Sequence, residues 1–475
     1  MSQFVSPWRG EPETVGTVAV IGMGKIGLPL AAQYAARGWH VIGVDVLPWV
    51  VETLNKGRVH IFDEPGLDER IAEAHAAGRF RATTSHAEAA GEADVVVMIV
   101  PVMLSEVKEP DYRYMDPATQ AVGAGLHPGV LVVYETTLPV GDTRERYRPM
   151  LEAASGLHCG DPDEGFLLAF SPERVYTGRT FHDLETYPKL VGGVDATSGA
   201  RAAAFYRSVL PAEVWQLSTA EAAEFAKLAE TTYRDVNIAL ANQFAAYAER
   251  MGVDIQEVIR GSNSQPFSHI HQPGIGVGGH CIPVYPHFLV SRAPELTLPA
   301  LSRQVNDGQV GVAVQAVERE LGSLEGTPVL VLGLTYREDV KELAYTRAIP
   351  LIERLAFHGA EVWAYDPLLA DDEVARTGAR PWHWGEPGPF RAIVVQTAAR
   401  QFRTLDPAWF PELGVVYDGR NSLREASLPE GVTYVGVGVP DVRGGSRARR
   451  ARRSPEGPDG ADPDAAGPRG TALRP

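Results

Sequence analysis

The chain has 475 residues, of which 44% are hydrophobic and 22% are charged, and its formal net charge is −16. Such a composition indicates a globular chain of two or three domains, and the acidic balance argues against a nucleic-acid-binding body. No apolar run is long enough to span a bilayer, which favours a cytoplasmic protein, and two cysteines are too few for a disulfide framework or a cysteine zinc site, so no metal is expected.

The first predicted elements form a dinucleotide-binding fingerprint. A strand over residues 18–21 and a helix over residues 28–36 enclose a turn made of Gly22, Met23, Gly24, Lys25, Ile26 and Gly27. This order of strand, turn and helix is what the fingerprint requires. Asp45 follows the next predicted strand, about 20 residues beyond the glycines, where a carboxylate would bind the ribose hydroxyls. A 2′-phosphate would meet like charge there, which favours NAD over NADP as the cofactor.

Short apolar runs then alternate with helical segments up to about residue 210, and they predict strands at residues 95–100, 130–134, 167–171 and 190–193. The alternation predicts a doubly wound parallel sheet. From Ser218 to about Arg250 the chain lacks Pro and Gly and is rich in alanine, which predicts one long helix between domains.

A second unit of strand, helix and strand repeats this layout over residues 328–366, without the three glycines. The predicted fold class is therefore α/β, with two Rossmann-like doubly wound domains joined by a long-helix connector. We expect an NAD-binding domain at 1–210, a helical connector at 211–310, a second Rossmann-like domain at 311–440, and a disordered tail at 441–475. The tail carries an arginine cluster and few large apolar residues, so it cannot bury enough surface to fold.

The loop GVGGHCIP carries the most informative residue, Cys281. A lone cysteine is more often a small buried hydrophobe than a nucleophile. The flanking glycines, which let the backbone approach a ligand closely, and the adjacent His280 favour the nucleophile here. Cys159, in an apparent loop beside Gly160, is interpreted as incidental.

Seven segments in a fixed order resemble the UDP-glucose/GDP-mannose dehydrogenase family: GMGKIGLPLA, YETTLPVGDTR, SPERVYTGR, the run from Glu224 to Asn242, GVGGHCIP, LGLTYREDV and DGRN. The likeness covers roughly residues 16–438 and is strongest to the UDP-N-acetylhexosamine dehydrogenases of bacteria and archaea. It implies that the second Rossmann-like half binds the nucleotide diphosphate of a UDP-sugar, that the active site lies between the halves, and that the long helix builds a homodimer.

The resemblance also implies catalytic roles. Cys281 matches the family nucleophile, and Lys227 matches a lysine whose ammonium would stabilise a developing alkoxide. Glu173 matches a carboxylate that handles protons or water, and Thr137 matches a threonine that orders the cofactor or a water. The last three residues also have plainer interpretations: Lys227 as a solvated helix lysine, Glu173 as part of a helix-capping segment, and Thr137 as a turn residue.

The substrate would be held by residues that the same comparison implies: Glu173, Lys227, Thr231, Gly278, Gly279, Arg337 and Arg420. The two arginines could pair with diphosphate oxygens, although isolated arginines are usually surface charges. Four positions depart from the family pattern. Thr231 stands for an asparagine, Tyr285 for an aspartate, and Phe267 and Ala344 for arginines, with Arg347 close to the last of these. Tyr285 is expected to tune the pocket, since a phenol is uncharged at neutral pH.

Three functions follow as hypotheses. The first is an NAD-dependent, four-electron oxidation of the C6 alcohol of a UDP-hexose or UDP-N-acetylhexosamine to a uronic acid, through a thiohemiacetal and a thioester on Cys281. It would feed a surface polysaccharide or a glycosylated metabolite. The alternatives are a two-electron sugar or hydroxyacid dehydrogenase that does not need Cys281, and a nucleotide-sugar-binding homologue without turnover.

Overall fold

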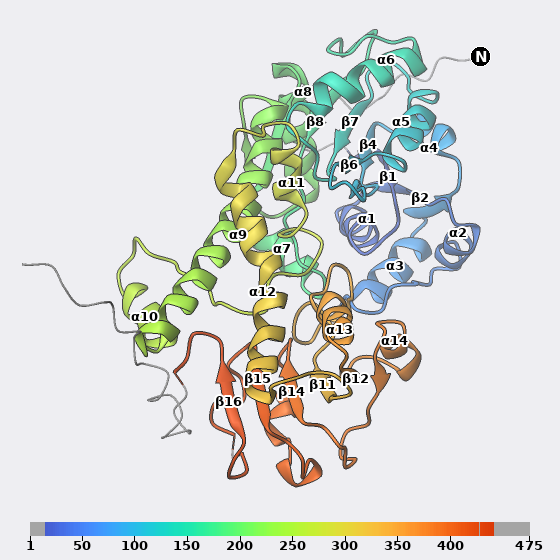
Figure 1. Cartoon of the computed structure of the whole chain (residues 1–475). Coiled ribbons are helices and arrows are strands. Elements are labelled where there is room, and N and C mark those ends of the chain that lie inside the picture. The colour runs from blue at the N-terminus through green and yellow to red at the C-terminus, as the bar shows by residue number, and fades with distance from the viewer. Residues whose placement is uncertain (1–14, 427, 441–475) are drawn as a thin grey trace, which may run out of the picture.

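The computed structural model describes residues 15–426 and 428–440. The chain forms two α/β units, one above the other in Figure 1, joined by two long helices that run between them. The tail predicted at 441–475 lies outside the described residues. In the part of the chain that the structure describes, no helix is both long and apolar enough to cross a membrane.

The N-terminal unit is built on an eight-stranded sheet of order β10-β9-β8-β7-β4-β1-β2-β3. Its strands are β1 (Thr17–Ile21), β2 (His40–Val44), β3 (Phe80–Thr83), β4 (Val95–Met98), β7 (Leu131–Tyr134), β8 (Leu167–Phe170), β9 (Lys189–Gly193) and β10 (Val214–Gln216). A hairpin of β5 (Met103–Leu104) and β6 (Pro110–Asp111) lies apart from this sheet.

Helices cover both faces of this sheet, as a doubly wound fold requires, and each face has its own apolar core. They are α1 (Gly27–Ala36), α2 (Pro48–Leu54), α3 (Leu67–Ala76), α4 (His86–Glu92), α5 (Met115–Gly123), a π-helical turn η1 (Thr143–Tyr147), α6 (Arg148–Ser155), α7 (Thr180–Thr186) and α8 (Ala196–Val209).

One feature corrects the prediction of a parallel sheet: β8 and β9 are antiparallel. The connection between them does not cross the sheet, because its helix α7 is held at the carboxyl edge. Glu64 accepts hydrogen bonds there from the N–H groups of Gly178 and Thr180, both at 2.8 Å. The chain therefore re-enters the sheet from the edge at which it left.

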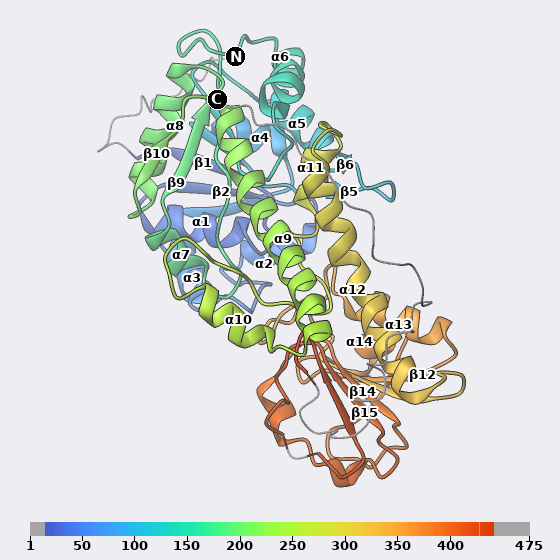
Figure 2. The same cartoon turned by 60° about the vertical axis from the view of Figure 1, so that its left-hand side comes forward.

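The connector contains α9 (Ala220–Met251), α10 (Ile255–Ser262), α11 (Tyr285–Val290) and α12 (Thr297–Leu321). Helix α9 begins where the Thr219 hydroxyl accepts from the N–H of Ala222 at 3.1 Å, and it ends at Gly252 in the left-handed conformation. Helices α9 and α12 lie side by side, as Figure 2 shows. The boundary predicted at residue 310 falls inside α12.

The C-terminal unit is a six-stranded parallel sheet of order β13-β12-β11-β14-β15-β16. Its elements are β11 (Pro328–Leu332), α13 (Ala348–Phe357), β12 (Glu361–Tyr365), α14 (Asp371–Ala375), β13 (Arg380–Pro381), β14 (Ala392–Val395), the 3-10 turns η2 (Arg400–Thr404) and η3 (Pro407–Trp409), β15 (Val415–Asp418) and β16 (Thr433–Gly436). After β11 the chain turns at Gly333, where φ is +81° and a Cβ would lie 2.0 Å from the carbonyl oxygen of Thr397. Both the backbone angle and the close approach require glycine.

Candidate active site

The three fingerprint glycines meet three different physical demands. Gly22 has φ of +107°, which permits the tight turn after β1. At Gly27 a Cβ would lie 1.8 Å from the carbonyl oxygen of Gly22, so the helix can pack this closely only without a side chain. At Gly24 nothing lies within 4 Å, which leaves open space in front of the backbone. This division matches what a dinucleotide diphosphate needs, so Gly22, Gly24 and Gly27 fit NAD.

Asp45 lies at the carboxyl end of β2, beside this turn, and is half-buried. Its carboxylate accepts hydrogen bonds from the N–H groups of Met23 at 3.2 Å and Leu47 at 2.9 Å. The sequence analysis missed two histidines close to it, His60 and His86. Burial lowers the pKa of both, so they are neutral at pH 7 and can only donate or accept hydrogen bonds beside Asp45.

The cysteine loop leads directly into α11. The carbonyl oxygen of Cys281 accepts from the N–H of Tyr285 at 2.9 Å, which places the half-buried thiol one turn before that residue. On its other side, Gly279 donates to the carbonyl oxygen of Ala344 at 3.2 Å. A Cβ at Gly278 would lie 2.9 Å from the Tyr336 side chain. The glycines thus let the loop pack against the C-terminal unit, and no open space faces them on that side.

Glu173 is fixed by both of its oxygens. Lys189 Nζ lies 2.7 Å from one, and the N–H groups of Arg174 and Val175 donate to the other at 2.7 and 3.1 Å. Burial alone would raise the pKa of Glu173, but the Lys189 ammonium, with a smaller contribution from Lys227, holds it below its ordinary value. Glu173 is therefore a carboxylate at neutral pH.

A second carboxylate, Glu135, lies behind this pair. Lys189 Nζ bridges to it at 3.1 Å, and the phenols of Tyr34 and Tyr206 donate to its other oxygen. Burial raises the pKa of Glu135, while Lys189 opposes that shift. Lys189 is thus a buried cation fixed between two carboxylates, and if it moved away both would lose their cation.

Lys227, on α9, is 6% exposed, and its charge contributes to the lowered pKa of Glu173. Thr231, one turn further along, is fully buried. Its hydroxyl donates to the helix carbonyls of Lys227 at 3.0 Å and Leu228 at 3.1 Å. The hydroxyl proton is therefore used within the helix and is not directed at a bound sugar.

The two predicted diphosphate arginines lie in different surroundings. Arg337 is exposed, and its guanidinium lies 5.8 Å from the ring centre of Tyr176. The Tyr176 hydroxyl in turn accepts from Arg234, on α9, at 2.7 Å. Arg420 instead donates through Nε to the carbonyl oxygen of Gln396 at 3.0 Å. Arg234 was not anticipated from the sequence, because a single arginine on a helix carries no motif.

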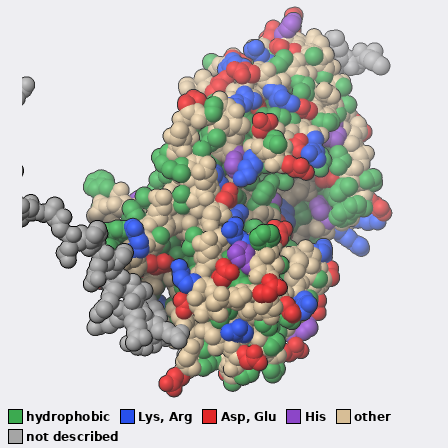
Figure 3. All heavy atoms as spheres, in the orientation of Figure 1, with side chains coloured by type: hydrophobic (Ala, Val, Ile, Leu, Met, Phe, Trp, Pro, Cys, Tyr) green, Lys and Arg blue, Asp and Glu red, His purple; other side chains and the backbone are tan. Residues whose placement is uncertain are grey.

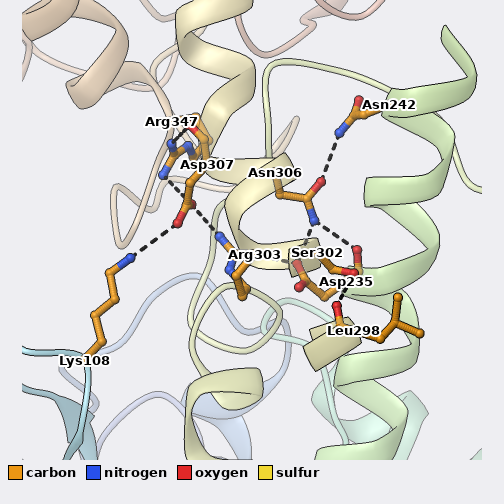
Figure 4. A network of polar contacts seen from close by, with 9 residues as sticks. All are labelled: Lys108, Asp235, Asn242, Leu298, Ser302, Arg303, Asn306, Asp307 and Arg347. Atoms are coloured by element: carbon orange, nitrogen blue, oxygen red, sulfur yellow. Dashed lines mark hydrogen bonds and ion pairs between the residues drawn. The ribbon is translucent and has the colours of Figure 1, made fainter. Parts of the chain in front are cut away.

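Phe267 and Ala344 stand at the two positions where the family pattern has an arginine. Phe267 lies on the loop after α10 and is 93% exposed. Ala344 is followed by Arg347, but that guanidinium is bound elsewhere: Nη1 lies 3.4 Å from Asp307 Oδ1. Asp307 also pairs with Arg303 on α12 and with Lys108 from the β5–β6 hairpin, as Figure 4 shows. Arg347 therefore helps to join the two α/β units through α12 and does not face the fingerprint turn.

A second connection between the units runs through Glu342, in the loop after β11. Its Oε2 lies 3.3 Å from Lys25 Nζ in the fingerprint turn and 3.6 Å from His280 Nε2 beside the cysteine. Lys25 also pairs with Asp63 at 2.9 Å. The neighbouring His280 and, to a smaller extent, the N–H of Ala344 and the charge of Lys25 lower the pKa of Glu342 to about 2. The dinucleotide turn, the cysteine loop and the C-terminal unit thus meet at one carboxylate.

The face drawn in Figure 3 is hollowed between the two units. A different cavity, of about 790 Å³, lies around Cys159, Arg144 and Asp195 and contains none of the predicted site residues. Burial raises the pKa of Cys159 to about 12, so its thiol stays protonated at neutral pH. This agrees with the interpretation of Cys159 as incidental.

Three family models together match most of the chain. They describe the NAD binding domain, the central domain and the UDP binding domain of the UDP-glucose/GDP-mannose dehydrogenase family, at residues 16–210, 221–307 and 330–425. The chain belongs to this family. It is accordingly an NAD-dependent nucleotide-sugar dehydrogenase.

Individual relatives agree with the family models. UDP-N-acetyl-D-mannosamine dehydrogenase of Pyrococcus horikoshii is 34% identical over 90% of this chain and 100% of its own length, and its solved structure superposes with a TM-score of 0.79. The Escherichia coli K12 enzyme of the same name is also 34% identical, over 74% of this chain and 86% of its own. NDP-N-acetyl-D-galactosaminuronic acid dehydrogenase of Methanosarcina mazei superposes with a TM-score of 0.77 at 29% identity, covering 90% of this chain and 96% of that one.

Besides His60, His86 and Arg234, the sequence analysis missed Glu135, Lys189 and Glu342. Glu135 lies inside the motif YETT and could have been noticed as a charge that directly continues an apolar strand. Lys189 and Glu342 carry no such signal. Their partners lie 54 and 317 residues away in the chain, so no local pattern reports the contact.

Proposed function

We propose that this dehydrogenase carries out a four-electron oxidation, converting the C6 alcohol of a UDP-sugar to a uronic acid through a thioester on Cys281. The observation that supports the proposal is the contact of the fingerprint turn and the cysteine loop with one carboxylate, Glu342, at the junction of the two units. Separately, the charge of Lys227 contributes to the lowered pKa of Glu173.

When bound, NAD accepts a hydride from the sugar carbon. In this proposal, the Lys227 ammonium stabilises the alkoxide from which that hydride leaves. The Cys281 thiolate then adds to the aldehyde carbon and forms a thiohemiacetal, which becomes a thioester when a second hydride leaves the same carbon. The ionised Glu173 then orients a water and takes its proton as the thioester is hydrolysed. One alcohol, one water and two NAD+ thus give one carboxylate, two NADH and three protons.

For the sugar, we propose a UDP-N-acetylhexosamine, with UDP-ManNAc first and UDP-GlcNAc second. The support is the name of several relatives, UDP-N-acetyl-D-mannosamine dehydrogenase, which are 34% identical to this chain. The pathway served, a surface polysaccharide or a glycosylated metabolite, and the cytoplasmic location stay predictions.

We also propose a homodimer built on α9. Large apolar side chains on this helix are 39–55% exposed, although a helix of a soluble protein normally buries such residues. They are Phe225, Tyr233, Leu240, Phe244, Tyr247 and Met251. Light scattering is expected to return about twice the chain mass of 51.4 kDa, and a monomer mass would contradict the proposal.

The test of the reaction is the ratio of NADH formed to nucleotide sugar consumed, measured with UDP-ManNAc, UDP-GlcNAc, UDP-glucose and UDP-galactose. We expect two NADH per sugar for the native substrate, whereas a two-electron dehydrogenase gives one. The substitution Cys281→Ser is expected to abolish acid formation and to leave sugar binding intact, because a hydroxyl is far less ionised than a thiol. Normal uronic acid production by that variant would exclude the thioester. No NADH with any sugar would favour a binding homologue without turnover.

A further inference from the structure

A buried network of charged side chains ends at Glu173. Its exposure increases in one direction: the Glu135 side chain is 0% exposed, that of Lys189 is 5% exposed and that of Glu173 is 11% exposed. Lys189 Nζ donates to Glu135 Oε2 at 3.1 Å and to Glu173 Oε2 at 2.7 Å. Glu173 is therefore the outermost of the three groups, and the other two lie behind it.

The inner end of the network is fixed by two buried phenols. Tyr34, on α1, donates to Glu135 Oε1 at 3.0 Å, and Tyr206, on α8, donates to the same oxygen. Lys189 Nζ also lies 4.9 Å from the centre of the Tyr206 ring. Glu135 directly follows β7, and Lys189 is the first residue of β9. The sheet and two helices thus hold the Lys189 ammonium in place, and its position does not depend on Glu173 alone.

The hydrogen bonds of Glu173 show which of its oxygens can take a proton. A carboxylate oxygen has about two acceptor positions. The N–H groups of Arg174 and Val175 use those of Oε1, at 2.7 and 3.1 Å. On Oε2 the described residues supply one donor, Lys189, so one acceptor position is left. Oε2 is thus the atom that can accept from a water while Lys189 holds the carboxylate.

The charges around Glu173 decide whether this oxygen is ionised. Burial raises the pKa of Glu173, but Lys189, the N–H of Arg174 and the charge of Lys227 on α9 together hold it below its ordinary value. Glu135 is the negative charge on the far side of Lys189, and the two phenols keep their protons because burial and Glu135 raise their pKa. Without Lys189, two buried carboxylates would lie close together without their shared cation, and Glu173 would take up a proton more readily.

We propose that Lys189 is a positioning residue for the hydrolysis of the thioester: it keeps Glu173 ionised and directs Glu173 Oε2 at the hydrolytic water. In that step the water oxygen adds to the thioester carbon and the water proton passes to Oε2. The C–S bond breaks with its electron pair left on the sulfur of Cys281, and Glu173 then releases the proton to solvent. This role deepens the proposed function and rests on it, but the effect of Lys189 on Glu173 can be measured with no substrate present.

The substrate-free test is the ionisation of Glu173. Lys189→Met combined with Glu135→Gln removes the cation without leaving Glu135 as an unpaired buried charge. Infrared spectra of the full chain are recorded from about pH 3 to about pH 9, and subtracting the same chain with Glu173→Gln isolates the band of protonated Glu173. We expect the midpoint of that band to lie about one to two pH units higher in the double variant than in the native chain. An unchanged midpoint would overturn the proposal, whatever the enzyme does with sugars.

The role in turnover is measured as the hydrolysis of the thioester. The enzyme is mixed with UDP-ManNAc and NAD, and mass spectrometry of the intact chain follows the sugar adduct on Cys281 over time. In the double variant we expect the adduct to decay about tenfold more slowly than in the native chain near pH 5, with a smaller difference at higher pH, where Glu173 ionises again. The affinities for sugar and NAD should be unchanged, since Lys189 lies behind Glu173.

Lys189→Arg separates the charge from the geometry. The guanidinium keeps the cation but is longer and planar, so Glu173 should stay ionised while its Oε2 is displaced. We expect a native infrared midpoint and hydrolysis that is about threefold slower at every pH. Native hydrolysis in both this variant and the double variant would overturn the proposal.

The matched control is another buried ion pair, that of Asp235 and Arg303, whose side chains are 0% and 5% exposed and lie 2.6 Å apart. Asp235→Asn combined with Arg303→Met should lose stability and leave both pH profiles native. If it slowed hydrolysis with the same pH dependence, the effect would come from lost stability and the proposal would fail. If the native chain oxidises no sugar while the infrared midpoint still shifts, the positioning of Glu173 stands and the proposed function alone fails.

Discussion

The two Rossmann-like halves share a layout and use it differently. Each has a glycine after its first strand and an aspartate after its second. Asp366 in the C-terminal half is buried, and it accepts from the N–H groups of Leu334 at 2.7 Å, Thr335 at 3.1 Å and Leu368 at 2.9 Å. Asp45 is half-buried and accepts from two N–H groups, with open space at Gly24 beside it.

The difference shows that the same acidic position can serve binding or folding. In the C-terminal half the protein's own backbone satisfies the carboxylate and closes the loop over it, so a ribose has no access. In the N-terminal half the carboxylate keeps acceptor capacity and faces the turn where a dinucleotide would lie. The shared fold does not determine whether a half binds a nucleotide. That depends on whether a ribose can reach the carboxylate and on whether the carboxylate still has an acceptor position to offer.

The largest loss of stability in both halves is expected from replacing the glycine in the tight turn after the first strand. Gly333→Ala and Gly27→Ala each place a Cβ within about 2 Å of a carbonyl oxygen, so backbone must move. We expect each to lose on the order of 3 kcal/mol of stability or to fail to fold. Gly431→Ala is the control: φ is +91° but nothing lies within 4 Å, so about 1 kcal/mol is expected. Urea unfolding followed by circular dichroism measures all three, and equal losses would show that the close contacts do not matter.

Exchanging the two aspartates for asparagine should separate their roles. Asp366→Asn turns an acceptor into a partial donor facing backbone N–H groups, and we expect it to cost about 2–3 kcal/mol of stability with no change in cofactor preference. Asp45→Asn should leave the melting temperature nearly unchanged and reduce the preference for NAD over NADP roughly tenfold, because the repulsion of a 2′-phosphate is lost. Calorimetric titration with each cofactor measures the second effect. An unchanged ratio of NAD affinity to NADP affinity would mean that Asp45 only stabilises the backbone at the end of β2.

Gly24→Ala sharpens the comparison at the turn itself. Because no atom lies within 4 Å, the added methyl should cost less than about 1 kcal/mol of stability. It would occupy the space through which the diphosphate approaches, so we expect NAD affinity to fall about tenfold. Fluorescence titration of the folded variant measures it. Unchanged affinity would show that the cofactor passes elsewhere.

The smallest effect is expected at the bridge between the halves. The pKa of Glu342 is lowered to about 2, below its ordinary value of 4.5, so the carboxylate stabilises the fold fully above about pH 4.5 and progressively less as the pH falls toward 2. Glu342→Gln should therefore be less stable than the native chain at pH 6 and approach it near pH 3. The Glu342 side chain is 23% exposed, and solvent screening keeps the difference below about 1 kcal/mol. Urea unfolding over this pH range tests the trend, with exposed Glu338→Gln as control. If the stability difference between the native chain and Glu342→Gln grew as the pH fell, this prediction would be wrong.

Much of the architecture followed from local pattern. Every strand named from the sequence is present within two residues of its predicted bounds, and the helix predicted from Ser218 to about Arg250 is α9 (Ala220–Met251). Alternation of apolar runs with helical segments reports which face of each element is buried, and this is the information that a doubly wound fold needs. The order of the seven motifs also indicated the family to which the chain belongs.

The sequence by itself also determined the dinucleotide turn, because strand, glycines and Asp45 lie within one continuous stretch. Only the tertiary structure decided which distant groups face one another: Lys189 between Glu135 and Glu173, Arg347 on Asp307, Thr231 bonded into its own helix, and β9 antiparallel to β8. Periodicity specifies burial, but it does not specify a partner. Ion pairs and hydrogen bonds are set by distance and by exclusion from water once the chain has folded, and neither quantity can be read from neighbours in the sequence.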